Sequence, residues 1–391
     1  MPIPQELIDL ILSNLAGDAL SLKSCSLTTR TFVRPSQVLL FKRVTILPPM
    51  PNRTGDNPCQ RFYKRITSSP HLASYVQELR VVLAVRPKGS EATEPGLSWI
   101  ISGRTLSLVL PLLNLTHISL ADTSFPGRAT GGLNWSQLGR SLRSALSAVF
   151  SSPILQSVDL QGVYISSPRE LLSLFCDACS LKSLNLTRVW FDPTHKDDSW
   201  PLSRTWRPKL TSVFFFETFG DPFCSHFRNP QIDLSGLTKL MILASSMDGW
   251  IFGPDVTPVL GDLMIYLDPL PSFNSFVTPN LRSLRVFTSN WSEGLLQFFT
   301  VCPRNAHIEI FSLDGPSTPC TVDLTVLNDA VESLLPHLPS LKKVQLRVLQ
   351  TRDVDHQAVL DWAETIRASL KSLASRGLLS ITDILGIRNM Q

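Results

Sequence analysis

The sequence predicts an α/β protein, with a short group of three helices at the N-terminus followed by repeated strand and helix segments around a parallel sheet. Three observations predict this class. About the first 46 residues carry apolar side chains at helical spacing. After them, a phrase of the form apolar-x-x-apolar-x-apolar recurs along the chain, and amphipathic stretches separate its copies. Short strands that alternate with helices indicate a parallel sheet, because parallel strands need crossover connections.

The composition predicts a soluble chain that resides inside the cell. Of 391 residues, 43% are hydrophobic and 17% are charged, and the net charge is +4. The cations are scattered, with no run longer than Lys42-Arg43. Nucleic acid is therefore not an expected partner, because its binding needs clustered lysine and arginine. Seven widely spread cysteines fit a reducing compartment, so we expect a cytoplasmic and/or nuclear protein.

The opening stretch, MPIPQELIDLILSNL, predicts a helix that is apolar on more than one side. A surface helix normally needs about three apolar positions in seven. This helix has more, namely Leu7, Ile8, Leu10, Ile11, Leu12 and Leu15. A membrane span needs about 20 apolar residues, and Glu6 and Asp9 interrupt the run, so neither membrane insertion nor a secretory signal is expected. We expect a helix that is buried on two sides.

Two further helices and a linker are predicted next. Asp18 is placed to cap a helix over DALSLKSCSL, and a third segment, TTRTFVRPSQVLLF, is interrupted by Pro35. Three helices in about 42 residues bury too little surface to be stable alone, so they must pack on something else. The proline-rich stretch LPPMPNRTGDN predicts a loop. We therefore expect an N-terminal domain over 1–46, a linker over 47–60 and a second domain over 61–391.

The N-terminal residues resemble an F-box. The residues that carry the resemblance are Ile3-Pro4-x-Glu6-Leu7-Ile8, Ile11-Leu12, Leu15, Ser24-Cys25-Ser26-Leu27, Arg30, Phe32 and Leu40-Phe41. The resemblance implies that this domain binds the Skp-type adaptor of a cullin-type (SCF) ubiquitin ligase through its first helix. The implied contact residues are Pro4, Leu7, Ile8, Ile11 and Leu15. The alternative is that the three helices only cap the end of the repeated region.

The recurring phrase resembles the rhythm of a leucine-rich repeat, in which each short strand extends a parallel sheet. Its copies are Val76-Leu79-Val81, Leu115-Ile118-Leu120, Leu155-Val158-Leu160, Leu181-Leu184-Leu186, Leu210-Val213-Phe215, Leu240-Leu243, Leu260-Leu263-Ile265, Leu281-Leu284-Val286 and Leu341-Val344-Leu346. The helical stretches between them are SQLGRSLRSALSAVF, SPRELLSLFCDAC, SEGLLQFFTVC and LNDAVESLL. The copies are irregularly spaced, so the repeat boundaries stay open. An ordinary α/β domain with similar strands is the alternative.

In such a repeat, the residues between the apolar positions point out along the concave face. The early strands offer small polar residues there, namely His117, Ser119, Ser157, Asp159, Ser183 and Asn185. The later strands offer aromatic, thioether and cationic side chains, which are the usual anchors of protein interfaces. The predicted target-binding residues are Phe214, Phe216, Met264, Tyr266, Arg285, Phe287, Lys343 and Arg347. The alternative is that a loop or the long C-terminal helix covers Phe214 and Phe216.

Catalytic motifs are not found in the sequence. There is no Gly-x-Ser-x-Gly elbow, no phosphate-binding Gly-x-x-x-x-Gly-Lys loop and no His-Glu-x-x-His pair. Cys176 and Cys179 have the spacing of metal ligands, and Cys224 with His226 would complete a zinc site. Near the end of an amphipathic helix, however, cysteines usually behave as small buried hydrophobes. We expect no cofactor and no metal.

Three functions follow from these patterns. The first is a non-catalytic substrate receptor that binds the Skp-type adaptor, and through it a cullin, with the N-terminal helices and an unknown target protein with the repeats. The second is a leucine-rich-repeat scaffold or binding protein without a ligase role. The third is an enzyme whose residues match no motif. Co-purification with the adaptor separates the first two.

Overall fold

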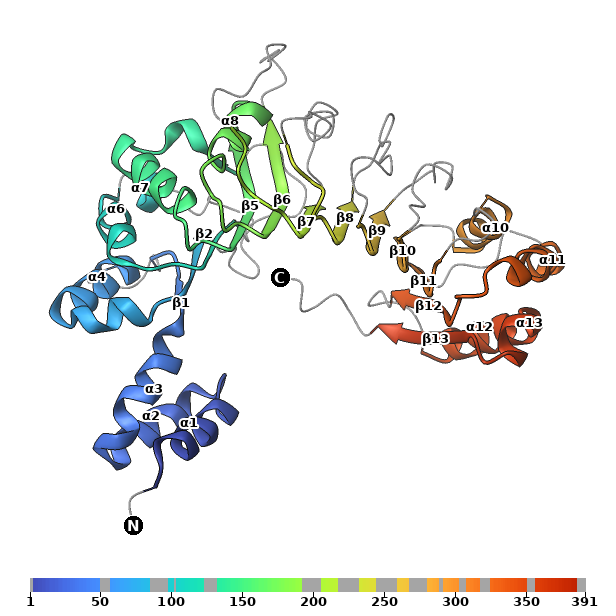
Figure 1. Ribbon diagram of the computed structural model, residues 1–391, viewed down its shortest axis with the longest axis horizontal. Coiled ribbons are helices and arrows are strands. Elements are labelled where there is room, and N and C mark those ends of the chain that lie inside the picture. The colour runs from blue at the N-terminus through green and yellow to red at the C-terminus, as the bar shows by residue number, and fades with distance from the viewer. Residues whose placement is uncertain are drawn as a thin grey trace. The chain divides into compact units, whose positions relative to one another are not determined.

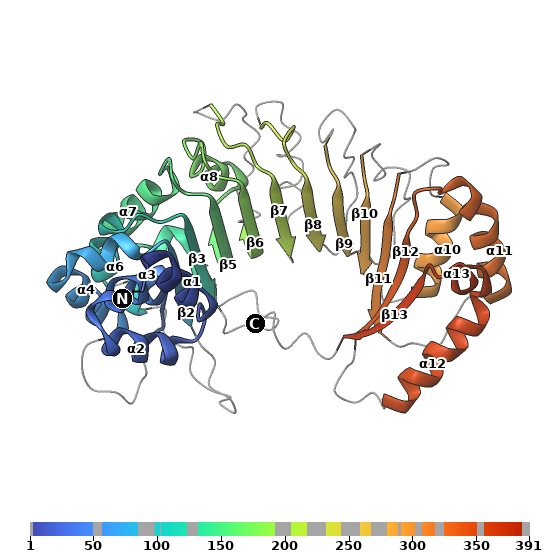
Figure 2. The ribbon, with the colours of Figure 1, turned by 60° about the horizontal axis from the view of Figure 1, so that its bottom comes forward.

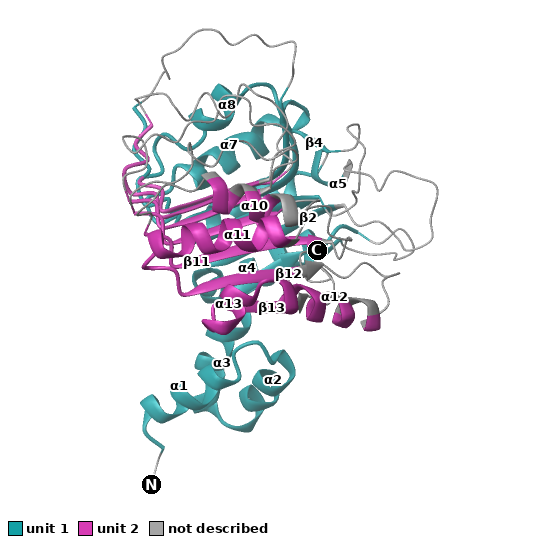
Figure 3. Cartoon of the chain, turned by 90° about the vertical axis from the view of Figure 1, so that its right-hand side faces the viewer, with its two compact units in different colours: residues 1–208 teal, residues 209–391 magenta. Residues whose placement is uncertain are grey.

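The computed structural model describes most of the chain, and its residues fall into two compact units, Met1–Pro208 and Lys209–Gln391 (Figure 3). The described residues are 3–49, 57–84, 98–101, 103–122, 132–191, 205–216, 232–243, 259–266, 280–287, 291–301, 307–316, 324–349 and 356–384. Every strand pairing within each unit is parallel among these residues. The predicted α/β class with a parallel sheet is confirmed.

Three helices open the first unit: α1 (Gln5–Asn14), α2 (Ala19–Thr28) and α3 (Arg30–Lys42). The Asp18 side chain accepts hydrogen bonds from the backbone N–H groups of Leu20 and Ser21, so it caps α2 as expected. Pro35 lies inside α3 without ending it, contrary to the prediction. A proline inside a helix costs about 3 kcal/mol, and the packing of α3 against α1, α2 and the 3-10 helix Pro70–Tyr75 offsets this cost.

The remainder of the first unit is a parallel sheet with helices on one face. Its strand order is β1-β2-β3-β5-β6, with β4 beside β5. The strands are β1 (Arg43–Ile46), β2 (Glu78–Ala84), β3 (His117–Asp122), β4 (Leu133–Asn134), β5 (Ser157–Ile165) and β6 (Ser183–Phe191). The helices are α4 (Pro58–Ser68), α5 (Ser98–Ile101), α6 (Thr105–Val109), α7 (Arg140–Phe150) and α8 (Pro168–Ser173), with short 3-10 turns at Leu110–Leu112 and Trp135–Gln137.

The first domain boundary differs from the expectation. Helix α3 leads directly into β1 (Figure 1), and Arg43 to Ile46 of β1 pair with Glu78 to Val81 of β2. The end of the predicted N-terminal domain is therefore already a strand of the sheet. The predicted linker 47–60 also extends too far, because α4 begins at Pro58 with a capping box between Asn57 and Gln60. Linker residues 50–56 lie outside the described part of the chain.

The second unit repeats the strand pattern, in the order β7-β8-β9-β10-β11-β12-β13. The strands are β7 (Ser212–Phe216), β8 (Lys239–Leu243), β9 (Asp262–Tyr266), β10 (Ser283–Phe287), β11 (Ile310–Pro316), β12 (Lys343–Leu349) and β13 (Leu379–Ile384). The helices are α10 (Trp291–Val301), α11 (Leu324–Leu334), α12 (His356–Ser369) and α13 (Lys371–Ser375), with a 3-10 turn at Leu335–His337. Helices α10, α11 and α13 lie along one face of β10–β13 (Figure 2).

The recurring phrase forms the core of both units. Nearly all its predicted positions are buried, as in Leu155-Val158-Leu160 and Leu281-Leu284-Val286, whose members have no exposed surface. The structure corrects the phrase in β8, which is Leu237-Leu240-Ile242. A further copy of the phrase, which was not predicted, is Ile308-Phe311-Leu313 in β11, and each of its side chains is at most 1% exposed. Phe311 stacks on Phe298 of α10, with ring centroids 3.6 Å apart. This contact packs α10 against the sheet.

A bifurcated hydrogen bond recurs just before the strands. In the first unit, the Thr116 carbonyl accepts from the N–H groups of Gln156 and Ser157, at 2.8 and 3.1 Å. In the second unit, the Gly261 carbonyl accepts in the same way from Arg282 and Ser283, at 2.8 and 2.9 Å. Equivalent residues of successive strands thus stand in register, so that outward-facing side chains form straight rows across each sheet.

One row contains a backbone irregularity. Gly162 in β5 and Arg188 in β6 both have positive φ, +69° and 53°, and the pairing of the two strands skips both residues. A side chain on Gly162 would bring its Cβ to 2.6 Å from the Cβ of Asp122 in β3. Only glycine fits here, because it tolerates positive φ and leaves room for the neighbouring strand.

Candidate functional site

Helix α1 presents two adjacent apolar faces. Ile8, Leu12 and Leu15 lie one turn apart in succession and pack with Leu22 of α2, which makes them part of the core of the three helices. Ile8 and Leu12 are at most 2% exposed. This core is completed by partly buried side chains, namely Cys25, Phe32, Leu39 and Leu40.

The neighbouring face of α1 is exposed. Leu7 and Ile11, one turn apart, are 50% and 47% exposed, and Pro4 is also exposed. Of the five predicted adaptor-binding residues, therefore, Pro4, Leu7 and Ile11 lie on the surface. Ile8 does not, since it is buried in the helical core, and Leu15 is partly buried against that core.

Four further apolar residues of this region, which were not predicted as adaptor contacts, are exposed. They are Ile3, Leu10, Leu20 and Leu27. Ile3 lies before the first residue of α1, whereas the helical spacing of 100° per residue places Leu10 beside Leu7 and Ile11. We call the residues Leu7, Leu10 and Ile11 the α1 apolar face.

The second candidate surface is the outward row of side chains on β7–β12. Register aligns Phe214 of β7 with Met264 of β9 and Arg285 of β10, through Met241 of β8. Phe214 stacks on Phe216, with ring centroids 6.3 Å apart, and both rings are half-buried. Of the other predicted residues, Met264 is only 7% exposed, whereas the Tyr266 side chain lies outside the described part of the structure.

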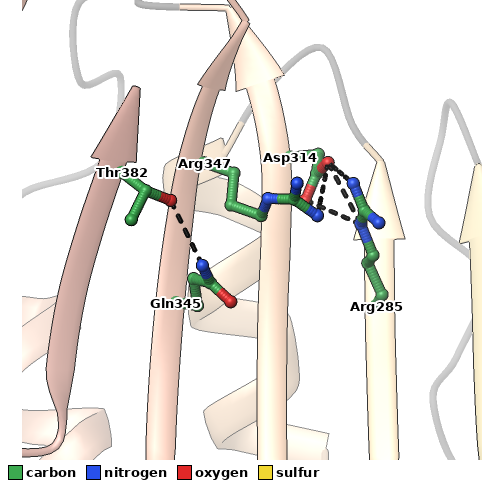
Figure 4. A network of polar contacts seen from close by, with 5 residues as sticks. All are labelled: Arg285, Asp314, Gln345, Arg347 and Thr382. Carbon is green, nitrogen blue, oxygen red and sulfur yellow. Dashed lines mark hydrogen bonds and ion pairs between the residues drawn. The ribbon is translucent and has the colours of Figure 1, made fainter. Parts of the chain in front are cut away.

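The predicted cations Arg285 and Arg347 converge on one acid, Asp314 of β11 (Figure 4). Arg285 donates from Nε to both carboxylate oxygens at 3.1 Å and from Nη2 to Oδ2. Arg347 approaches from β12, with its Nη1 3.8 Å from Oδ2. Asp314 has no exposed surface, although it lies on the outward side of the sheet. We call Arg285, Asp314 and Arg347 the arginine–aspartate triad.

The triad has ordered neighbours. The Arg285 guanidinium carbon lies 4.9 Å from the ring centroid of Phe287, which is a cation–π contact. On β12, Gln345 donates to the Thr382 hydroxyl of β13 at 3.2 Å, and Lys343 lies two residues before Gln345 on the same outward face. Cross-strand contacts therefore hold this end of the row in one arrangement.

Asp314 was not among the predicted residues. It directly follows Leu313, the last residue of the overlooked phrase in β11. Recognition of that phrase would have placed Asp314 on the outward face. Predicting its contact with Arg285 would still have required the register of β10 and β11, because Asp314 aligns with Phe287 and not with Arg285.

The outward row of the first unit differs. Ser119 of β3 donates to the Asp159 carboxylate of β5 at 2.9 Å, and Thr187 donates to the Asn185 side chain at 3.1 Å. Burial raises the pKa of Asp159 above its ordinary value of 3.8, although the hydrogen bond from Ser119 and the charges of His117 and Arg80 oppose the rise.

No metal-binding arrangement is formed within the described residues. Cys176 is buried and contacts the Leu172 carbonyl at 3.6 Å, whereas Cys179 is exposed. Cys224 and His226, the other members of the possible zinc site, lie outside the described residues. Across the described residues there is no group of three metal-ligating side chains. None of the helices that the structure describes has the length and apolar character of a membrane span.

No protein-family model matches the chain, and no curated protein matches it.

Proposed function

We propose that this protein is the substrate-recognition subunit of a cullin-type ubiquitin ligase. In this role the helices α1–α3 are an F-box that binds the Skp-type adaptor, and the strands and helices that follow are an irregular leucine-rich-repeat-like solenoid that binds a target protein. The observation that carries the proposal is the α1 apolar face, which is exposed while the same helix buries Ile8 and Leu12 in its own core. The role requires a cytoplasmic or nuclear location.

An exposed apolar face on a small helical cluster needs a partner. Leu7, Leu10 and Ile11 are each about half exposed, between 47% and 59%, and they lie three or four residues apart or next to one another on one helix. Contiguous apolar patches of this kind mark protein interaction sites, because burying them removes apolar area from water at about 25 cal/mol per Å². An adaptor that covers this face would bury the second side of α1.

A cap for the repeated region is the second candidate role of these helices. It is favoured by the continuation of α3 into β1 and by the contact of α3 with the 3-10 helix Pro70–Tyr75. A cap, however, is expected to present a polar outer face. The α1 apolar face therefore favours the adaptor-binding role over a purely capping one.

Target binding is assigned to the outward row of β7–β12. This row combines stacked rings, Phe214 and Phe216, with the arginine–aspartate triad. Aromatic and arginine side chains are enriched at protein interfaces and among the residues that contribute most to binding, because they bury a large area. A scaffold without a ligase role would use the same surface, so the adaptor decides between the two functions.

The deciding experiment is co-purification of the full chain with a co-expressed Skp-type adaptor. The double variant Leu7→Asp with Ile11→Asp is expected to weaken binding by at least about 100-fold, because each aspartate would place an unpaired charge in a desolvated contact. The measurement is the dissociation constant by isothermal titration calorimetry.

The matched control is Leu108→Asp with Ile154→Asp. Leu108 and Ile154 are 52% and 43% exposed, close to the values for Leu7 and Ile11, but they lie outside α1–α3. The control should bind the adaptor like the unmodified chain. If both double variants bind equally well, or if the unmodified chain does not bind, the ligase role is wrong and the scaffold role remains.

A further inference from the structure

The arginine–aspartate triad contains one more positive charge than negative charge. Arg285 and Arg347 each carry +1, whereas the Asp314 carboxylate carries −1, so the three side chains sum to +1. Asp314 is fully buried, while the side chains of Arg285 and Arg347 stay 26% and 27% exposed. The excess charge is therefore accessible, yet it lies where much of the surrounding water has been removed.

Both guanidinium groups retain donors that Asp314 does not use. A guanidinium group has five N–H donors. Arg285 directs Nε and Nη2 at Asp314. Arg347 forms an ion pair at 3.8 Å, which is too long for a hydrogen bond. Within the described part of the chain neither group has another hydrogen-bond partner, so several N–H donors remain for a ligand.

Asp314 and Phe287 restrict the movement of the Arg285 donors. The Arg285 guanidinium is held by a two-point contact with the Asp314 carboxylate and by the Phe287 ring, 4.9 Å from its centroid. Donors that are fixed before a ligand arrives cost less entropy on binding, and arginine binds planar anions through two parallel hydrogen bonds. The site is thus built for a planar acid.

The net charge distinguishes between two classes of anion. A carboxylate carries −1 and would bring the site to neutrality. A phosphate monoester carries about −1.5 to −2 at pH 7, which would leave excess negative charge beside the buried Asp314 carboxylate. The repulsion grows in a partly desolvated setting, so the triad favours the carboxylate.

We infer that Arg285 and Arg347, positioned by Asp314, bind an aspartate or glutamate side chain of an extended target segment. This inference rests on the proposed role of the outward row of β7–β12 as the target-binding surface. The ligand carboxylate would accept hydrogen bonds from both guanidinium groups, and an apolar residue next to it would pack on the Phe287 side of the site.

The test is an array of random 12-residue peptides, each made in three forms with glutamate, glutamine or phosphoserine at one central position. The full chain is applied to the array, and the dissociation constants of selected peptides are measured by fluorescence polarisation. We expect the glutamate form to bind at least about tenfold more tightly than the glutamine form, because the glutamine amide lacks the charge. We also expect it to bind more tightly than the phosphoserine form.

Arg347→Gln is the variant that tests the site, because Arg285 continues to neutralise Asp314 in it. This variant should bind the glutamate and glutamine forms equally. Lys371→Gln is the matched control, since it removes one positive charge from the exposed surface of α13, outside the outward row of β7–β12, and it should keep the preference for glutamate. Should Arg347→Gln lower the melting temperature, Arg347→Lys replaces it. That variant keeps the charge but not the planar donor pair, and its preference should be intermediate.

Three outcomes would overturn the inference: equal binding of the glutamate and glutamine forms, tighter binding of phosphoserine, or no peptide bound by the unmodified chain. A preference for peptides whose only carboxylate is at the C-terminus would also contradict it, because the site would then recognise chain ends. Adaptor co-purification is independent of all four outcomes, so failure here is distinguishable from failure of the ligase role.

Discussion

The outward rows of the two units differ sharply, although the strands beneath them are alike. In the first unit the row holds small polar side chains that pair with one another, such as Ser119 with Asp159 and Thr187 with Asn185. In the second unit it holds stacked aromatic rings and two arginines on a buried acid. Both rows project from parallel strands with the same buried phrase.

This difference shows that the scaffold and the surface are separately encoded. Alternate residues of a strand point to opposite faces, so the inward core positions and the outward positions impose no chemistry on one another. The core positions are similar in both units, for example Val158 and Leu160 in β5 and Leu284 and Val286 in β10. Function is therefore expected where the outward residues depart from small polar side chains.

The largest expected difference between the two rows concerns their acids. Asp314→Asn should lower the free energy of unfolding by about 3 kcal/mol, because it leaves Arg285 and Arg347 close together without the buried charge that neutralises them. The measurement is urea denaturation followed by circular dichroism. Asp262→Asn in β9 is the control, because Asp262 is half exposed and its ion pair with Lys239 is long, at 4.0 Å. The free energy of unfolding should change by no more than about 0.5 kcal/mol in this variant. Equal effects of the two variants would show that the triad adds no stability.

A second effect of similar size concerns the backbone irregularity of the first unit. Gly162→Ala should cost about 3 kcal/mol, because alanine is strained at positive φ and its Cβ would lie 2.6 Å from the Cβ of Asp122. Gly377→Ala in the second unit is the matched control. Gly377 has a similar φ of +68° but no atom within 4 Å of the added Cβ, so only the strain of about 1 kcal/mol remains. Urea denaturation of both variants gives the comparison, and a larger loss for Gly377→Ala would contradict it.

Much of the fold could be predicted because burial follows the spacing of apolar residues. The phrase in β5 and the phrase in β10 place every apolar side chain in the core. The error in β8 arose where apolar residues are consecutive, since Leu240, Ile242 and Leu243 allow two registers. Local preference alone predicts that Pro35 interrupts the third helix, whereas the packing of α3 overrides that preference.

The candidate surfaces were less predictable, because they depend on what covers each residue. Helical spacing separates Ile8 from Leu7, but the packing of α2 and α3 decides which of the two faces is buried. In the second unit, the sequence indicated Arg285 and Arg347 as target-binding residues, but it did not indicate that the register of three strands brings both to Asp314. Contacts between strands far apart in sequence leave no local pattern.

The smallest expected effect has the opposite sign and concerns Asp159 in the first unit. Burial raises the folded-state pKa of Asp159 above 3.8, so its contribution to stability is fully present below pH 3.8 and is lost as the pH rises through the raised pKa. Asp159→Asn removes the charge and keeps an oxygen that accepts from Ser119. At pH 7 the variant should therefore equal or exceed the unmodified chain in stability, by no more than about 1 kcal/mol, and this advantage should shrink toward pH 4. Asp233→Asn is the control, and its effect on stability should change with pH in the opposite direction, because a hydrogen bond from Ser235 lowers the pKa of Asp233. Urea denaturation at pH 4 and pH 7 measures how the free energy of unfolding of each variant changes with pH. If Asp159→Asn lost as much stability at pH 7 as Asp314→Asn, the two rows would hold their acids in the same way.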